Sequence, residues 1–271
     1  MHNLNELIHY KPAAKALAGR NILITGAGDG IGRAAALSFA HYGATVILLG
    51  RSEAKLEAVY DEIESSGGEQ PVIATLDLDT ATHQDYLNLN NEIIENLGAL
   101  HGLLHNAGIL GEMKPLAQYS EDTFARVMNI NLTSNFLLTK AVLPSLELAD
   151  NASIIFTSSS VGRKSRAYWG SYAVSKFATE GLMQTWADEF EGTSNIRANS
   201  LNPGATQTNM RRQAYPGETP SDNPTAEEIM GAYLFLMSAD SMSVNGEQLN
   251  AQINKETKKE RNKQTLKAPT E

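Results

Sequence analysis

The amino-acid sequence predicts an α/β fold, a single domain whose doubly wound, mostly parallel sheet has about seven strands and helices on both faces. Short runs that are apolar along their whole length alternate with segments whose apolar residues recur at helical spacing. Strands that are apolar on both sides need cover on both sides, which is typical of parallel sheets. No linker, internal repeat or shift in composition divides this series, so we expect one domain over residues 1–253, with residues 1–18 as an N-terminal extension.

The expected strands follow one another in a regular order. The first, residues 21–25, is a branched, apolar run that ends at Gly26. Runs of the same kind occupy residues 45–49, 72–76, 103–105, 153–157 and 196–201, and a last short run occupies residues 248–251. Helical spacing is clear over residues 31–42 and 53–65, between the first three strands. Because such sheets bind ligands outside the carboxyl ends of their strands, the residues that follow each strand are the first candidates for a site.

Composition bounds the function. The chain of 271 residues is 42% hydrophobic, enough for a sizeable core, and it contains no cysteine, which excludes disulfides and thiolate nucleophiles. The net charge of −9 argues against a nucleic-acid partner. No apolar run approaches the roughly 18 residues of a membrane span, and no metal-ligand spacing is present. The first residues do not resemble a secretory signal, so we expect a cytoplasmic protein.

Residues 254–271 differ from the rest of the chain in composition. They are rich in Lys, Glu, Thr and Gln, with six basic residues against three acidic ones. We interpret them as a charged, flexible tail, and a tether to an anionic partner is the alternative.

Tyr172 and Lys176 are four residues apart, so in a helix both side chains would project from the same face. A tyrosine alone is a poor acid or base near neutrality, because its pKa is about 10. An ammonium group one turn away favours the phenolate and lowers that pKa. The phenol could then pass a proton to or from a substrate oxygen, although the same spacing also occurs on ordinary surface helices.

The first strand runs into a glycine-rich turn, residues 25–32, that is followed by a helical segment. Glycines let the backbone turn tightly and let a pyrophosphate approach the amides at the start of a helix. The strict G-x-G-x-x-G spacing is absent, but the strand before the turn and the helix after it favour dinucleotide binding over an ordinary loop. The expected contacts are Thr25, Gly26, Asp29, Gly30, Ile31 and Gly32.

The end of the second strand indicates which dinucleotide is bound. Sites that prefer NAD usually place Asp or Glu about 20 residues beyond the glycines, on the ribose 2′-hydroxyl. Here the strand is followed by Gly50, Arg51 and Ser52, and no carboxylate is present at its tip. Because a guanidinium can bind a 2′-phosphate through two hydrogen bonds, we expect NADP(H), with NAD(H) possible, and Arg51 as the phosphate ligand.

Together these residues resemble the short-chain dehydrogenase/reductase family over roughly residues 18–251. The glycine turn matches the family pattern Thr-Gly-x-x-x-Gly-x-Gly, which implies a Rossmann fold. The resemblance implies further cofactor contacts after the third, fourth and sixth strands. They are Asp77, Leu78, Asn106, Ala107, Gly108, Pro203, Gly204, Thr206 and Thr208, with Tyr172 and Lys176 at the nicotinamide. A closer resemblance is to a subgroup of bacterial oxidoreductases in this family, which implies NADP.

The resemblance also implies a catalytic set of Asn131, Ser159, Tyr172 and Lys176. The family's serine commonly precedes the tyrosine by about thirteen positions, which selects Ser159 (172 − 159 = 13) over the serines on either side of it. In the implied mechanism, hydride passes between nicotinamide and a carbonyl or secondary alcohol while Tyr172 exchanges a proton with its oxygen. Lys176 would lower the tyrosine pKa, and Asn131 would hold a water that belongs to a proton relay.

The expected partner is a small carbonyl or alcohol, with no nucleic acid and no membrane. The resemblance implies a homodimer or homotetramer formed through helices near residues 120–145 and 171–190. Two other functions remain open, a 3-oxoacyl-[acyl-carrier-protein] reductase-like activity and a non-catalytic module that senses NADP. The second should lack the tyrosine or the lysine, and both are present.

Basic residues in two segments near the carboxyl edge of the sheet could attract a substrate that carries a carboxylate or phosphate. They are Arg163, Lys164, Arg166, Arg211 and Arg212. A solvated loop with an oligomer contact is the simpler interpretation. His105 would end a buried strand, where we expect it to bond a backbone partner rather than take part in catalysis.

Overall fold

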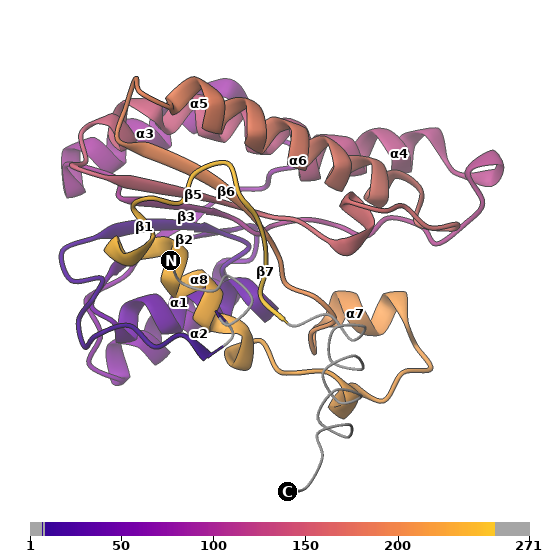
Figure 1. The fold of residues 1–271 in the computed structure, drawn as a ribbon, viewed down its shortest axis with the longest axis horizontal. Helices are drawn as coiled ribbons and strands as arrows, with labels where there is room; N and C mark the ends of the chain where they lie inside the picture. The colour runs from indigo at the N-terminus through magenta and orange to yellow at the C-terminus, as the bar shows by residue number, and fades with distance from the viewer. Residues whose placement is uncertain (1–6, 8, 253–271) are drawn as a thin grey trace, which may run out of the picture.

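The computed structural model describes residue 7 and residues 9–252, and seven strands in this part of the chain form one parallel sheet (Figure 1). The strands are β1 (Asn21–Thr25), β2 (Thr45–Gly50), β3 (Val72–Thr75), β4 (Gly102–His105), β5 (Ala152–Thr157), β6 (Ile196–Asn202) and β7 (Gln248–Asn250). Their order in the sheet is β3-β2-β1-β4-β5-β6-β7. The seven predicted strands are confirmed, and each end differs from the prediction by at most one residue.

Helices cover both faces of this sheet, as the sequence predicts (Figure 1). The α-helices in the described residues are α1 (Gly30–His41), α2 (Glu53–Ser65), α3 (His83–Leu97), α4 (Glu121–Met128), α5 (Ser134–Glu147), α6 (Gly170–Phe190), α7 (Asn209–Ala214) and α8 (Met230–Met237). Helices α1, α2 and α8 lie on one face, and α3, α4, α5 and α6 on the other. None of the helices described is long and apolar enough to cross a membrane.

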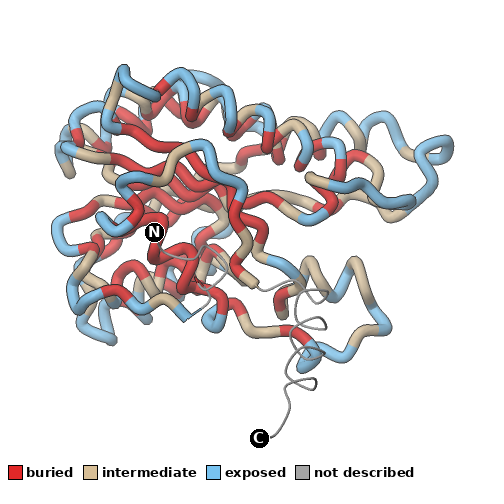
Figure 2. The backbone as a smooth tube through the Cα atoms, viewed as in Figure 1, coloured by how far each residue is buried: buried red, intermediate tan, exposed pale blue. Residues whose placement is uncertain are grey.

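The alternation of side chains along β2 explains why both faces are covered. Val46 and Leu48 pack into the apolar core on the α1 and α8 side, whereas Ile47 and Leu49 pack into the core on the α3 and α5 side. Successive residues of a strand point to opposite faces, so an entirely apolar strand supplies two cores at once. Figure 2 shows the strands as the most deeply buried layer of the molecule.

Three apolar residues of the predicted N-terminal extension belong to this packing. Leu7 and Leu17 are buried in the α1 and α8 core, and the ring of Tyr10 lies edge-on to that of Phe235, with 5.3 Å between ring centres. The segment before β1 therefore covers apolar surface of the domain. The predicted tail, residues 254–271, lies outside the described residues.

Two features of the fold position the site. Strands β1 to β3 are added to the sheet in one direction, and β4 to β7 in the other. The connections that leave the carboxyl ends of β1 and β4 therefore run to opposite sides, which opens a crevice between them. Helix α4 passes into α5 through a π-helical turn, Asn129–Thr133, rather than by a continuous α-helix. Such turns are rare and are often found at functional sites.

Candidate active site

Helix α6 presents Tyr172, Lys176 and Glu180 on one face, each one turn after the last. The three residues are buried, with exposed fractions of 8%, 4% and 4%. Lys176 donates a hydrogen bond from Nζ to the carbonyl oxygen of Thr157, over 2.7 Å, and the same nitrogen lies 5.7 Å from the centre of the Tyr172 ring. The end of β5 therefore fixes the lysine beside the tyrosine.

The three serines after β5 have different surroundings. Ser158 is buried and donates a hydrogen bond to Glu180 Oε1 over 2.5 Å. Ser159 is half-buried, and its side chain acts on Tyr172 in the direction that lowers the tyrosine pKa. Ser160 is exposed and begins a short 3₁₀ turn. Ser159, which the sequence spacing selects, is thus the serine whose side chain affects the tyrosine pKa.

Burial shifts the pKa values of Tyr172 and Lys176 in opposite directions. It raises the pKa of Tyr172 to about 12, and Ser159 opposes this rise. Burial also lowers the pKa of Lys176 to about 8, against the opposing charge of Glu180. The Tyr172 pKa therefore lies above its usual value in the protein alone, because removal of the phenolate from water outweighs the effect of Ser159. A lowering of this pKa by Lys176 stays a prediction.

Glu180 accepts hydrogen bonds from three side chains at once. Ser158 Oγ and Ser200 Oγ each lie 2.5 Å from one of its carboxylate oxygens, and Arg163 Nε donates to Oε1 over 3.1 Å. A buried carboxylate needs such donors to offset its lost hydration. Glu180 thereby ties β6 and the segment after β5 to α6. The sequence analysis missed this residue, although its four-residue step beyond Lys176 was a signal.

Asn131 lies within the π-helical turn and is fully buried. Its Oδ1 accepts from the amide of Ile109 over 2.8 Å, and its Nδ2 donates to the carbonyl of Ile109 and to Ser175 Oγ, each over 3.0 Å. A methyl group on Gly108 would lie 3.2 Å from Asn131 Oδ1. Asn131 therefore holds the segment after β4 against α6, and its proposed place in a water relay stays a prediction.

The glycine turn after β1 has little room for side chains. Gly26 has a φ of +69°, and a methyl group on Gly32 would lie 2.2 Å from the Gly26 carbonyl oxygen. Gly32 therefore lets the start of α1 lie directly against the turn. This close approach suits a backbone that must accept a pyrophosphate at a helix N-terminus, so the turn fits a bound dinucleotide.

Asp29 precedes α1 and joins the glycine turn to two other elements. Its Oδ2 accepts from Lys55 Nζ on α2 over 2.8 Å and from Asn209 Nδ2 on α7 over 3.0 Å. These hydrogen bonds, that from Lys55 above all, keep the pKa of Asp29 below its usual range. Thr208 lies close to Gly30, since a methyl group there would be 3.4 Å from Thr208 Cγ2. The turn and the start of α7 are therefore neighbours.

Thr25 connects the ends of β1 and β4. Its Oγ1 accepts from the amides of Asn106 and Ala107, over 2.9 and 3.0 Å, and donates to the carbonyl of Leu104 over 3.3 Å. Asn106 Nδ2 returns a hydrogen bond to the Thr25 carbonyl over 3.2 Å. These side chains fix the floor of the crevice at the reversal of strand order.

The loop after β6 is held by a residue that the sequence analysis missed. Gln252 Nε2 donates to the carbonyls of Pro203 and Ala205, each over 2.8 Å, and to Thr206 Oγ1 over 3.2 Å. A methyl group on Gly204 would lie 2.9 Å from the Gln252 amide. No local pattern marks Gln252, because it acts on residues nearly fifty positions earlier.

Three predicted cofactor residues lie at the ends of β2 and β3. Arg51 follows β2, is exposed and has no ion pair among the described residues. Asp77 follows β3 and accepts a hydrogen bond from the amide of Asp79 over 3.0 Å, while Leu78 is buried in the α3 and α5 core. The exposed guanidinium is free to meet an anion at this edge of the sheet.

One cavity of about 690 Å³ joins the predicted catalytic and cofactor residues. Its wall includes Ser159 and Tyr172, Ile31 from the glycine turn, and Pro203 and Thr206 from the loop after β6. Such a volume suits a small ligand with part of a cofactor. Arg51 and Asp77 are not among the residues that line it.

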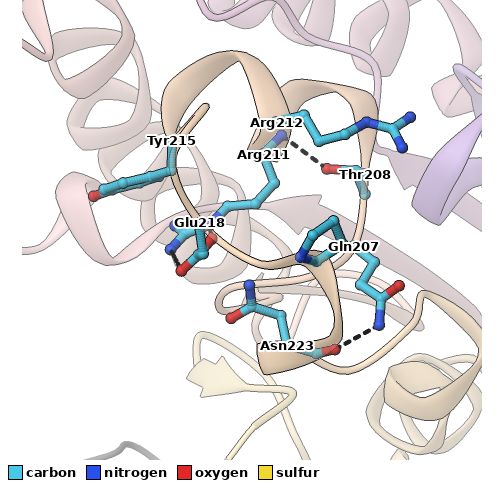
Figure 3. A pocket seen from close by; sticks show the side chains of 8 residues that line it. Gln207, Thr208, Arg211, Arg212, Tyr215, Glu218 and Asn223 are labelled. Atoms are coloured by element: carbon cyan, nitrogen blue, oxygen red, sulfur yellow. Dashed lines mark hydrogen bonds and ion pairs between the residues drawn. The ribbon is translucent and has the colours of Figure 1, made fainter.

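The five basic residues near the site have different partners. Arg163 donates to Glu180, to Asn250 Oδ1 over 3.0 Å and to the carbonyl of Leu249 over 2.9 Å. Arg211 binds both carboxylate oxygens of Glu218, and Arg212 donates to Asn209 Oδ1. Lys164 and Arg166 are exposed. Figure 3 shows Arg211 and Glu218 in a second cavity, of about 140 Å³, beside α7.

His105 has a different partner from the one expected. Its Nε2 lies 2.7 Å from Thr139 Oγ1, a side chain rather than the backbone, and its ring stacks on Phe156 with 4.8 Å between centres. Burial, with the charge of Lys176, lowers the pKa of His105 to about 3. The imidazole is therefore neutral at physiological pH. Among the described residues, no group of His, Asp and Glu could hold a metal ion.

A seven-stranded parallel sheet, a glycine turn at its reversal, and buried Tyr172 and Lys176 near Ser159 are the features of a nucleotide-dependent oxidoreductase. The family model for short chain dehydrogenases matches residues 20–219. The chain belongs to the short chain dehydrogenase family, and it is an oxidoreductase.

Individual relatives agree with the expected bacterial subgroup. The uncharacterised oxidoreductase YciK of Escherichia coli (strain K12) is 48% identical over 245 residues, which are 90% of this chain and 96% of YciK. A short chain dehydrogenase structure from Pseudomonas syringae is 55% identical with a TM-score of 0.89, and the match covers 90% of this chain and 98% of that one. A short chain dehydrogenase from Escherichia coli CFT073, solved with NADPH, is 48% identical with a TM-score of 0.87, covering 89% and 100% of the chains.

Proposed function

We propose that the protein transfers hydride between NADP(H) and a carbonyl or secondary alcohol, with Ser159, Tyr172, Lys176 and Asn131 as its catalytic set. The observation that carries this proposal is that Ser159 and Tyr172 lie in the wall of one cavity that also reaches Ile31 of the glycine turn. A proton donor for the carbonyl oxygen and a cofactor face that delivers hydride to the carbonyl carbon would then meet at one carbonyl group.

The acidities support a role for Tyr172 as a proton donor in reduction. With a pKa of about 12 the phenol is protonated at neutral pH, so it can donate to a carbonyl oxygen that also accepts a hydrogen bond from Ser159. Lys176, whose pKa is about 8, still carries its charge at neutral pH and would stabilise the phenolate that remains. Bound NADPH would supply the hydride.

The cofactor would lie across the carboxyl edge of the sheet. The close-packed turn around Gly26 and Gly32 suits the pyrophosphate at the start of α1. Arg51 suits the 2′-phosphate, because it is exposed and has no acidic partner among the described residues. A relative 48% identical to this chain binds NADPH, which supports the same cofactor here.

The cofactor proposal is tested by titration of the protein with NADPH and NADH, followed by nicotinamide fluorescence. We expect NADPH to bind more tightly, and Arg51→Ala to weaken NADPH binding by at least about ten-fold, since a hydrogen bond to a charged group contributes about 1.5–3 kcal/mol. NADH binding should not change. Lys11→Ala, which removes an exposed charge before β1, is the control. Equal affinities for the two nucleotides would contradict the role of Arg51.

We also propose that the protein is a homodimer or homotetramer that associates through the outer face of α5 and α6. Phe136, Val174 and Phe177 on these helices are 40%, 41% and 44% exposed. Large exposed apolar side chains on one face are typical of an interaction surface. Analytical ultracentrifugation should find an oligomer for the wild type and a smaller species for Phe177→Asp. A monomeric wild type would contradict this assembly.

A further inference from the structure

The larger cavity is positively lined although the protein as a whole is negative. The residues that line it include Arg163, Lys164, Arg166 and Arg211, and none of the described lining residues is Asp or Glu. The whole chain has a formal net charge of −9. A cationic cleft in an acidic protein attracts anions selectively.

Two of these four cations already have acidic partners. Arg163 Nε donates to Glu180, over 3.1 Å, and the rest of its guanidinium holds the end of β7. Arg211 binds Glu218 through two hydrogen bonds of 2.6 and 2.7 Å, and its guanidinium stacks on the Tyr215 ring with 3.8 Å to the ring centre. Figure 3 shows this ion pair beside α7. Because Glu180 and Glu218 neutralise these two arginines, we assign Arg163 and Arg211 a structural role rather than a role in binding a ligand.

Lys164 and Arg166 are the remaining pair. Both are exposed, and neither has an acidic partner or a side-chain hydrogen bond among the described residues. They lie in the segment that joins Ser159 to Tyr172, so a proposed catalytic residue stands at each end of this segment. An anion bound by Lys164 and Arg166 would therefore have a fixed relation to the reacting carbonyl.

An apolar surface connects this pair to Tyr172. Leu110, Trp169, Met210 and Tyr215 line the same cavity. The Trp169 ring centre lies 5.6 Å from that of Tyr172 and 6.0 Å from that of Tyr215. Rings at these distances are in contact with one another and form a continuous apolar wall, which suits a flat, apolar body that lies against it between the two polar ends of a ligand.

We propose that the substrate is a carbonyl or alcohol with a flat apolar body and an anionic group, carboxylate or phosphate, that Lys164 and Arg166 bind. This proposal rests on the function proposed above. The cofactor does not need these two cations, because its phosphates are assigned to the glycine turn and to Arg51, and Arg51 does not line the cavity.

The test uses the protein saturated with NADP⁺ and measures ligand binding by isothermal titration calorimetry. The probes are para-formylbenzoate, para-formylphenyl phosphate and the neutral methyl ester of para-formylbenzoate. We expect at least one anion to bind about ten-fold more tightly than the ester, since two exposed ion pairs together make a modest contribution to affinity. The tighter anion identifies the chemical group.

Matched variants make the result specific. The double variant Lys164→Ala/Arg166→Ala should lose the preference for the anion and bind the ester as the wild type does, while Lys11→Ala should keep the preference. NADPH binding, which should not change, verifies the fold of each variant. Equal affinity of the wild type for anions and ester, or an equal loss in Lys11→Ala, would overturn the proposal.

The same probes separate this proposal from the proposed function. NADPH oxidation is measured with each aldehyde and with a panel of neutral ketones. Selective anion binding without turnover of any carbonyl would count against the proposed reaction and leave the anion site supported. Turnover of ester and acid with equal affinities would support the reaction and refute the anion site.

Discussion

Lys176 on α6 donates a hydrogen bond to the backbone carbonyl of Thr157 at the end of β5, over 2.7 Å. This contact fixes the ammonium group beneath the site, while burial lowers its pKa to about 8 and Glu180, one turn further on, acts in the opposite direction. Lys176 therefore gains or loses its proton close to physiological pH, and the activity should change with its protonation.

The pH dependence of reduction should follow Lys176. We expect kcat/KM to fall as pH rises through about 8, because the ammonium that stabilises the Tyr172 phenolate loses its proton there, whereas Tyr172 itself, with a pKa of about 12, remains protonated. The charge of Glu180 raises the Lys176 pKa, so Glu180→Gln should move this fall to lower pH. The measurement is a pH profile of NADPH oxidation.

Glu189→Gln is the matched control, since Glu189 is an exposed carboxylate on the same helix. It should leave the profile unchanged. If Glu180→Gln folds and has the wild-type profile, the carboxylate does not set the charge of Lys176.

Asn131→Ala should destabilise the protein by about 1–3 kcal/mol, because it leaves the part-buried amide of Ile109 without its acceptor and removes the buried contact with Ser175. The free energy of unfolding in urea measures this loss. Asn96→Ala on α3 removes an exposed amide that bonds only within its helix, and it should cost far less. Equal losses in the two variants would show that Asn131 does not hold the segment after β4.

Gly32→Ala should disrupt the glycine turn, because its methyl group would lie 2.2 Å from the Gly26 carbonyl oxygen and the backbone must move. We expect NADPH affinity to fall by more than about ten-fold, which corresponds to about 1.4 kcal/mol. Gly181→Ala on α6 has nothing within 4 Å of the new methyl group, so it should keep NADPH affinity and stabilise the helix by roughly 0.8–1 kcal/mol. Unchanged NADPH affinity in Gly32→Ala would contradict the proposed pyrophosphate site.

The sequence predicted the sheet well because its strands are apolar on both faces. Val46 to Leu49 supply both cores, and such runs have few other stable places in a fold. The predicted site residues gather at the carboxyl edge for the same reason, since parallel strands end on the same side. Ser159 illustrates this, because its spacing from Tyr172 selected a serine that lines the same cavity as the phenol.

Other parts of the site could not be predicted from local patterns. Gln252 holds the loop at Pro203 through contacts across 49 positions of the chain. The rise in the Tyr172 pKa depends on burial by several elements, which no spacing reveals. The tertiary structure also supplies the acidic partners of Arg163 and Arg211. These ion pairs distinguish the two arginines from Lys164 and Arg166, which have no acidic partner among the described residues.

The most direct test of the account compares wild type with Tyr172→Phe in NADPH oxidation, with a panel of aldehydes, ketones, quinones and acetoacetyl thioesters. The phenylalanine variant keeps the ring but removes the proton donor from the cavity that Ser159 also lines. We predict that the wild type reduces at least one carbonyl class, and that Tyr172→Phe loses about 10²- to 10⁴-fold in kcat while its NADPH affinity is unchanged. Equal rates for the two proteins on a reduced substrate would contradict the central role of Tyr172.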